Sequence, residues 1–342
     1  MAAVYPELLL SRRQLLQGAS LTGLGLLAGC GQWPGQTPAP TKVYRVGYLG
    51  TDPTAPEHEA FREELREYGY VEGKNLAVEY RWADRAAPSE LRGASARFAA
   101  ELVALPVDVI VAGGSGAGTA AREATSVVPI VLTRAADAVT TGLVASLARP
   151  GANVTGLSSI TPLLNAKNLE LLHAMVPQLS RIALIRVDDP VGVVFEEEAR
   201  AAAQALGIDL LALAVRNADD VEAVLNGAVR WHTEALWADG SALVVSMRAR
   251  IVAVAAQHGV PVVAQPRAFV EVGGLMAYGA SRISMARRAA YYVDRILKGT
   301  KPADLPVEQP MRFDFAINLQ TAHALGLTIP QHVLLQATEL IQ

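Results

Sequence analysis

The most informative stretch of this 342-residue sequence is Val109-Ile110-Val111-Ala112-Gly113-Gly114-Ser115-Gly116-Ala117-Gly118-Thr119-Ala120-Ala121. It begins as a run of branched apolar residues, which is typical of a buried parallel strand, and it ends in small helix-forming residues. The glycines between the two parts allow a sharp turn and a close approach of the backbone to a ligand. Free N–H groups at the start of the helix, together with the hydroxyls of Ser115 and Thr119, suit an anionic group. The stretch therefore predicts a strand, an anion-binding turn and a helix.

Branched apolar runs of this kind alternate along the chain with Ala/Arg/Glu-rich helical stretches. The alternation is typical of an α/β protein with parallel sheets. Because the pattern restarts after residue 158, we expect two doubly wound lobes of similar size. Strands are expected at 44–50, 76–82, 109–112, 129–133, 153–157, 181–187, 208–215, 235–238, 261–264, 275–279 and 306–317. Helices are expected at 56–68, at 88–104, after the glycine turn through residue 124, and at 139–147, 163–176, 193–206, 219–231, 242–258, 281–298 and 320–326.

The composition bounds the class of protein. A chain of 342 residues with 51% hydrophobic content can bury the cores of two lobes. Its formal net charge of −3 leaves no basic footprint, so we expect no nucleic-acid partner. Six histidines and one cysteine show none of the usual ligand spacings, so we expect no metal and no cofactor.

The first thirty residues have the character of an export signal. Ser11-Arg12-Arg13-Gln14-Leu15-Leu16 precedes a short apolar run and resembles a twin-arginine signal. Leu27-Ala28-Gly29-Cys30 then matches the lipobox of bacterial lipoproteins, in which the cysteine is lipidated after cleavage. The alternative is that Cys30 is an ordinary buried cysteine. We favour residues 1–30 as a signal peptide ending at a lipidated Cys30, and residues 31–42 as a flexible tether.

Ligands of open parallel sheets bind beyond the carboxyl ends of the strands. Loops at those ends supply the candidate binding residues, which are Gly50, Thr51, Ser115, Gly116, Ala117, Thr133, Asp189, Asp239 and Tyr278. Asp189 and Asp239 fit two roles equally, capping the next helix or contacting the ligand. Tyr278 fits equally well stacking on a flat ligand or packing in the wall of a cleft. Arg134 and Arg267 are interpreted as solvated charges.

Three enzymatic interpretations of the glycine turn are weaker. Residues 116–121 fit a relaxed dinucleotide fingerprint, with Asp137 as the ribose acid, but the fingerprint follows the third strand rather than the first. A P-loop is excluded because no Gly-Lys-Ser/Thr follows. A hydrolase elbow is only half present, since Ala117 stands where its second glycine belongs.

Several motifs together resemble a family of bacterial ABC-transporter substrate-binding proteins. They begin with Arg45-Val46-Gly47-Tyr48-Leu49-Gly50 and continue at 67–75, 79–83, 107–112, 141–151, 153–157, 273–279, 302–310 and 317–319. The resemblance covers residues 43–342, and the family includes the tryptophan/tyrosine transporter binding proteins. This chain departs from the family pattern at residues 188–190 and 239–242, which lie in loops of the second lobe.

The resemblance implies a type I periplasmic-binding-protein fold, with two lobes joined by three crossovers and closing on a ligand by hinge motion. It places residues 43–158 and 273–303 in lobe 1, and residues 159–272 and 304–342 in lobe 2. The strand that contains Tyr278 is accordingly expected in lobe 1.

The leading hypothesis is a non-catalytic, extracytoplasmic solute-binding component of an ABC importer, lipid-anchored through Cys30. It captures a small carboxylate-bearing solute, an amino acid and in particular an aromatic one, in the interlobe cleft, and passes it to a membrane permease and ATPase complex. By the logic of type I amino-acid binders, Ser115, Gly116, Ala117 and Thr133 would hold the carboxylate. Asp189 or Asp239 would bind the amine, and Tyr278 would flank the side chain. We expect a monomer; the alternatives are a sensor lobe that feeds a receptor and a dinucleotide-binding enzyme.

Overall fold

A computed structural model describes residues 42–83, 90–159 and 161–342. The signal peptide, the tether and Cys30 lie outside the described residues. Contacts divide the chain after Lys42, and residues 43–342 form one unit. Within the described part, none of the helices combines the length and the apolar character that a membrane span requires. The same part holds no group of three or more His, Cys, Asp or Glu residues placed to bind a metal ion.

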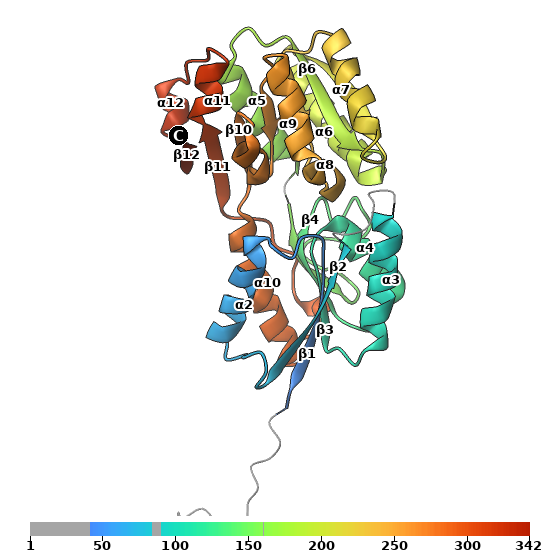
Figure 1. The fold of residues 1–342 in the computed structure, drawn as a ribbon. Helices are drawn as coiled ribbons and strands as arrows, with labels where there is room; N and C mark the ends of the chain where they lie inside the picture. The colour runs from blue at the N-terminus through green and yellow to red at the C-terminus, as the bar shows by residue number, and fades with distance from the viewer. Residues whose placement is uncertain (1–41, 84–89, 160) are drawn as a thin grey trace, which may run out of the picture. The chain divides into compact units, whose positions relative to one another are not determined.

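The first lobe is built on a five-stranded sheet with the order β2-β1-β3-β4-β5, in which every pair is parallel (Figure 1). Its strands are β1 (Tyr44–Gly50), β2 (Leu76–Trp82), β3 (Val109–Ala112), β4 (Ile130–Ala135) and β5 (Val154–Ser158). Its helices are α2 (Pro56–Glu67), α3 (Leu91–Ala104), α4 (Ser115–Ala124) and α10 (Arg282–Leu297), with the 3-10 turn η3 (Pro302–Asp304).

The second lobe is built on a seven-stranded sheet with the order β12-β11-β10-β9-β8-β6-β7. Its strands are β6 (Arg181–Val187), β7 (Asp209–Val215), β8 (Ala235–Ala238), β9 (Val262–Ala264), β10 (Met276–Ala280), β11 (Phe313–Asn318) and β12 (Glu339–Ile341). Only β10 and β11 pair antiparallel. Its helices are α5 (Thr161–Met175), α6 (Pro190–Ala205), α7 (Asp220–Arg230), α8 (Ala242–Ser246), α9 (Arg248–Gln257), α11 (Leu319–Ala324) and α12 (Gln331–Leu334), with the 3-10 helix η2 (Arg267–Val272).

Each sheet is buried on both faces because successive side chains of a strand point to opposite sides. In β3, Val109 and Val111 pack into the core shared with α2 and α10, while Ile110 and Ala112 pack into the core under α3 and α4. The second sheet repeats the pattern, since alternate side chains of β6 pack into the core beneath α5 and α6 and into the core beneath α7 to α9. The doubly wound α/β fold expected from the sequence is confirmed.

The crossovers between the lobes differ from the predicted positions. The strand that contains Tyr278 is β10, which pairs with β9 and β11 in the second sheet, whereas α10 packs on α2 in the first lobe. The chain therefore returns to the first lobe after Ala280, and the predicted return near residue 273 is wrong. The predicted third crossing near residue 304 is also too early, because the backbone N–H of Glu308 donates to the carbonyl oxygen of Gly156, beside β5. The first lobe thus contains 281–308, and the second lobe contains 159–280 and 313–342.

Two predicted helices also differ. Residues 139–147 form turns instead of a helix, because the carboxylate of Asp137 accepts the backbone N–H groups of Val139 and Thr140 and folds the segment on itself. The helix expected at 242–258 is two helices, α8 and α9, which meet at Met247. This break has a consequence for the site, since it creates a second helix start at Arg248.

Candidate functional site

The glycine turn joins β3 to α4 as predicted, and its neighbours hold it from both sides. The backbone N–H of Gly113 donates to the carbonyl oxygen of Leu49 at 2.8 Å. The Oγ of Ser115 accepts the backbone N–H of Ala136 at 2.8 Å. These contacts tie the start of α4 to the ends of β1 and β4, so the turn aligns the strand ends of the first sheet.

A cavity of about 490 Å³ lies at these strand ends. Its volume is within the range of small-molecule binding sites. The first lobe contributes the loop after β1 and residues of β4, and the second lobe contributes α8 and the start of α9. Polar and charged lining residues are Tyr48, Thr51, Asp52, Glu57, His58, Thr133, Ser246 and the three arginines described below.

Tyr48 and His58 line one wall of the cavity, and Trp82 and Tyr80 pack behind it. The rings of Tyr48 and His58 meet edge to face at 4.9 Å, and His58 lies 4.6 Å from Trp82. Trp82 in turn stacks on Tyr80, with ring centroids 5.4 Å apart. The wall depends on Gly50, because a Cβ there would lie 2.4 Å from Cζ3 of Trp82. An edge of this kind offers a flat solute an apolar surface.

The hydrogen bonds of His58 define its tautomer. Nε2 lies 2.6 Å from the carbonyl oxygen of Asp52, which can only accept, so Nε2 carries the proton. Nδ1 then accepts from the hydroxyl of Tyr48 at 2.9 Å. Burial lowers the pKa of His58 below its ordinary value. The imidazole is therefore neutral at pH 7 and adds no charge to the cavity.

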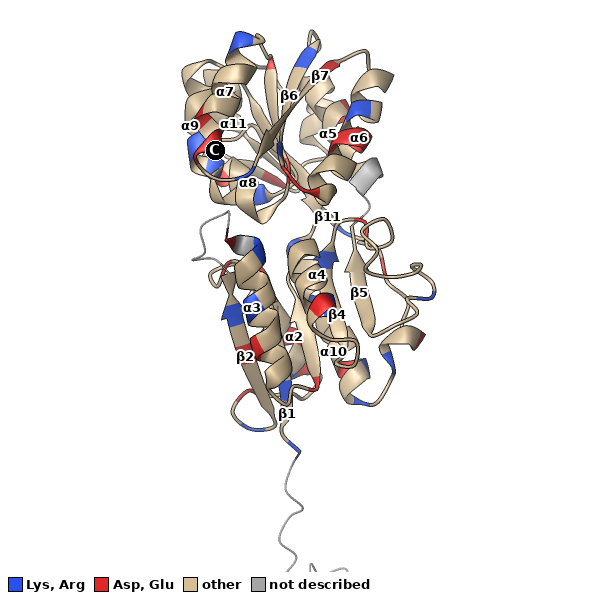
Figure 2. Cartoon of the chain, turned by 90° about the vertical axis from the view of Figure 1, so that its right-hand side faces the viewer, with Lys and Arg blue, Asp and Glu red and all other residues tan. Residues whose placement is uncertain are grey.

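Three arginines line the cavity: Arg134 from β4, Arg248 from α9 and Arg282 from α10. Arg248 and Arg282 are the first residues of their helices, where a positive charge opposes the helix dipole. The positive charge of Arg134, followed by burial, lowers the pKa of Arg282 to about 10. Figure 2 shows acidic and basic residues scattered over both lobes of the described chain.

Two carboxylates accompany the arginines. Glu57 lies 3.6 Å from the guanidinium of Arg282. Oδ1 of Asp52 accepts the backbone N–H and the hydroxyl of Thr54. Burial alone would raise the pKa of Asp52, but the hydrogen bonds from Thr54 and the charge of Arg248 hold it below its ordinary value. Both carboxylates thus have partners, and the three guanidinium groups outnumber them in the described lining of the cavity.

The structure brings three of the nine predicted binding residues to the cavity, namely Gly50, Thr51 and Thr133. The hydroxyl of Thr133 donates to the carbonyl oxygen of Ala112 at 3.3 Å. Ser115, Gly116 and Ala117 do not line the cavity. The same holds for Asp189, Asp239 and Tyr278, each of which has a partner within the second lobe.

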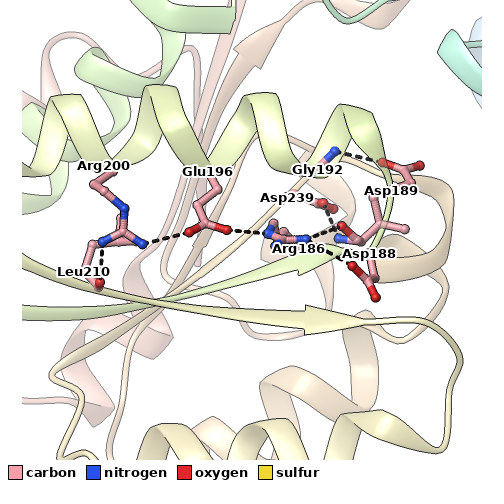
Figure 3. A network of polar contacts seen from close by, with 9 residues as sticks. Arg186, Asp188, Asp189, Gly192, Glu196, Arg200, Leu210 and Asp239 are labelled. Carbon is pink, nitrogen blue, oxygen red and sulfur yellow. Dashed lines mark hydrogen bonds and ion pairs between the residues drawn. The ribbon is translucent and has the colours of Figure 1, made fainter.

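Asp189 and Asp239 serve their own lobe (Figure 3). The carboxylate of Asp189 caps α6 by accepting the backbone N–H of Gly192 at 2.8 Å, which was one of its two expected roles. Asp239 accepts the backbone N–H groups of Val187 and Ser241 and the hydroxyl of Ser241. Burial raises the pKa of Asp239 to about 6 against these hydrogen bonds. Tyr278 takes neither of its expected roles at this cavity, because its ring stacks on Phe313 at 5.9 Å within the second lobe.

Sequence reasoning missed Arg248 and Arg282 and took Arg134 for a solvated charge. A signal was present for the first two, because an arginine in the first turn of a helix is unfavourable and needs a reason. It was hidden at Arg248, since the break between α8 and α9 carries neither glycine nor proline. Arg134 carries no local signal, and only the geometry of the sheet brings it to the cavity.

The fold and the cavity define a two-lobed binding protein of the type I periplasmic class. The solved structure of a leucine-binding protein from Thermotoga maritima shares the fold, with a TM-score of 0.55, 16% identity and coverage of 77% of this chain and 78% of that one. The chain belongs to the family described as ABC transporter substrate binding protein, whose sequence model matches residues 51–341. The family consists of solute-binding proteins rather than enzymes, and its members are extracytoplasmic or membrane-associated.

Other relatives are similar over most of their length. A tyrosine-binding protein of Clostridioides difficile (strain R20291) is 24% identical over 320 residues, which are 90% of each chain. The structure of an ABC domain in complex with L-Trp from Streptococcus pneumoniae has a TM-score of 0.80 and 24% identity, covering 88% of this chain and all of that one. A conserved domain protein from Vibrio cholerae has a TM-score of 0.80 and 28% identity, covering 87% and 100%.

Proposed function

We propose that this protein is the extracytoplasmic solute-binding component of an ABC importer, and that it captures a small carboxylate-bearing solute in the cavity between its two lobes. The observation that carries the proposal is the convergence of Arg134, Arg248 and Arg282 on one cavity. Guanidinium groups bind carboxylates through paired, charge-assisted hydrogen bonds. Relatives named for binding tyrosine and tryptophan, both of which carry a carboxylate, support this solute class.

The distribution of the arginines suits a protein that closes on its solute. Arg134 and Arg282 belong to the first lobe, and Arg248 belongs to the second. A carboxylate held by both sets bridges the lobes, so binding energy favours the closed state over the open one. Gly50, Thr51 and Thr133 shape the first-lobe side of the cavity, and Tyr48 and His58 offer an apolar edge.

The delivery steps follow from the family and from the N-terminal segment. We infer that residues 1–30 direct export, that Cys30 carries the lipid anchor, and that the loaded protein acts as a monomer on a permease and ATPase complex. The cavity binds and releases its solute unchanged.

A thermal-shift screen of residues 31–342 tests the proposal, because a ligand that binds only the folded state raises the melting temperature. The panel pairs amino acids, aromatic acids and small carboxylates with the carboxamide of each skeleton. We expect carboxylates to stabilise the protein by about 2.7 kcal/mol at a concentration 100 times Kd, and carboxamides to have no effect. A panel in which no carboxylate shifts the melting temperature contradicts the proposal.

A matched pair of variants on α9 locates the site. Arg248→Gln removes a cavity guanidinium, and we expect it to weaken carboxylate binding by about 10- to 100-fold, since hydrogen bonds to charged groups contribute about 1.5–3 kcal/mol. Arg250→Gln on the same helix removes an exposed arginine that pairs with Glu222 outside the cavity, and it should bind like the wild type. Equal affinities for the two variants would place the site elsewhere.

A further inference from the structure

We propose that the solute carries a net negative charge, with more carboxylates than ammonium groups, and that Arg134 sets this preference over zwitterionic amino acids. The inference rests on the proposed function and deepens it, because it states the charge class of the solute. It follows from the charges that line the cavity and from the partners that each of them already has.

The described residues that line the cavity carry one positive charge in excess. Arg134, Arg248 and Arg282 are cationic, Asp52 and Glu57 are anionic, and His58 is neutral. A zwitterionic amino acid adds no net charge and leaves the excess in place. A solute with one net negative charge neutralises it, and Coulomb attraction in a partly desolvated cavity is stronger than in water.

The excess charge can be assigned to Arg134. Glu57 pairs with Arg282, and Arg248, which has no ion pair among the described residues either, donates to the carbonyl oxygen of Val245 at 3.0 Å and lies near enough to Asp52 to lower the pKa of that carboxyl. No carboxylate of the described residues lies within ion-pair distance of Arg134. Arg134 instead faces Arg282 closely enough for their repulsion to dominate the lowered pKa of Arg282. A bound anion relieves this repulsion.

The two carboxylates that line the cavity in the described residues already have partners. Oδ1 of Asp52 already accepts two hydrogen bonds from Thr54, and Glu57 is held by Arg282. The two aspartates expected from the sequence to bind an amine, Asp189 and Asp239, do not line the cavity. An ammonium placed among three guanidinium groups would meet three like charges and would share Asp52 and Glu57 with the partners that they already have. The acidic group of the solute is therefore recognised, and an amine is not.

Isothermal titration with matched solutes tests the inference. Each pair shares one skeleton and differs only in the ammonium: phenylalanine and 3-phenylpropionate, tryptophan and 3-indolepropionate, glutamate and glutarate. In 20 mM salt at pH 7.5 we expect the member with the more negative net charge to bind at least about 10-fold more tightly in each pair that binds. We also expect its affinity to fall between 20 and 200 mM salt, because screening weakens attraction to a net charge.

Variants of Arg134 connect the preference to this side chain. Arg134→Gln should bring the affinity ratio within each pair close to one, and Arg134→Lys, which keeps the charge, should retain the preference. Arg149→Gln, an exposed arginine of the same lobe, should leave the ratio unchanged. If Arg134→Gln does not fold, the affinity ratio of the lysine variant and the salt dependence of the wild type still test the inference.

The outcomes separate the inference from the proposed function. If amino acids bind as tightly as their deaminated partners, or more tightly, the inference is overturned while the proposed function stands. If Arg134→Gln still binds the more negative solute of each pair more tightly, Arg134 does not set the preference. If no carboxylate of any kind binds, the proposed function fails, and the inference fails with it.

Discussion

Replacing Glu198 with glutamine will stabilise the protein above pH 7 and will do so far less at pH 5. Glu198 lies half-buried on α6, where its Oε2 accepts the amide of the fully buried Asn165 at 3.1 Å. Burial, followed by the negative charge of Asp137, raises the pKa of Glu198 to about 7. Glutamine has the same shape and still offers an oxygen to Asn165, so the variant removes the ionisable proton and little else.

The sign and size of the effect follow from linkage. A carboxyl with a raised pKa in the folded state contributes stability that is complete below its unfolded pKa and is lost as the pH rises through about 7. The shift from the ordinary value of 4.5 to about 7 corresponds to about 3.4 kcal/mol, at about 1.36 kcal/mol for each pKa unit. Because Glu198 is partly solvated, we halve this to about 1.7 kcal/mol. The variant should then melt about 2–4 °C higher than the wild type at pH 8.5.

Urea unfolding and calorimetry at pH 5, 7 and 8.5 measure the effect. The matched control is Glu197→Gln, because Glu197 is the exposed neighbour on the same helix. Its curve should run parallel to the wild-type curve at all three values. Parallel curves for Glu198→Gln, or the same gain in Glu197→Gln, would refute the electrostatic argument.

Three further substitutions test the packing around the cavity. Gly156→Ala should prevent folding, because the backbone has φ +120° and the new Cβ would lie 2.3 Å from the carbonyl oxygen of Leu132; soluble yield and circular dichroism report this. Gly50→Ala should displace Trp82, weaken solute binding and cost about 1–3 kcal/mol in urea unfolding, and an unchanged affinity would remove the aromatic wall from the site. Asp189→Ala should cost about 1 kcal/mol by removing the cap of α6 and leave solute affinity unchanged, whereas weakened binding would restore Asp189 as a ligand contact.

The sequence was sufficient to predict the elements that local pattern governs. The bounds of β1, β2, β6 and β8 match the predicted ranges, because each is a branched apolar run between polar or glycine-containing segments. The strand and helix on either side of the glycine turn also match. In such segments, hydrophobic period and turn chemistry agree with the tertiary structure, so local reasoning is enough.

The sheet to which β10 belongs could not be predicted in the same way. Its five residues look alike whether they extend the first sheet or the second, since both positions are buried. The choice depends on β11, whose antiparallel register matches Met276 with Ile317 across 41 positions of sequence. Pairing at that separation leaves no local pattern, and the error in the lobe boundaries follows from it.

The arginines of the cavity show what local reasoning can and cannot detect at a binding site. Arg248 and Arg282 each begin a helix, and there a positive charge lowers helix stability instead of raising it. Arg282 also tolerates the nearby charge of Arg134 with one carboxylate, Glu57, beside it. Choices that oppose the local preference are expected where function requires them. A free protein that places three guanidinium groups around one cavity raises its own electrostatic energy, and a bound anion lowers it again. The cost in the unbound state therefore adds to the affinity for the solute.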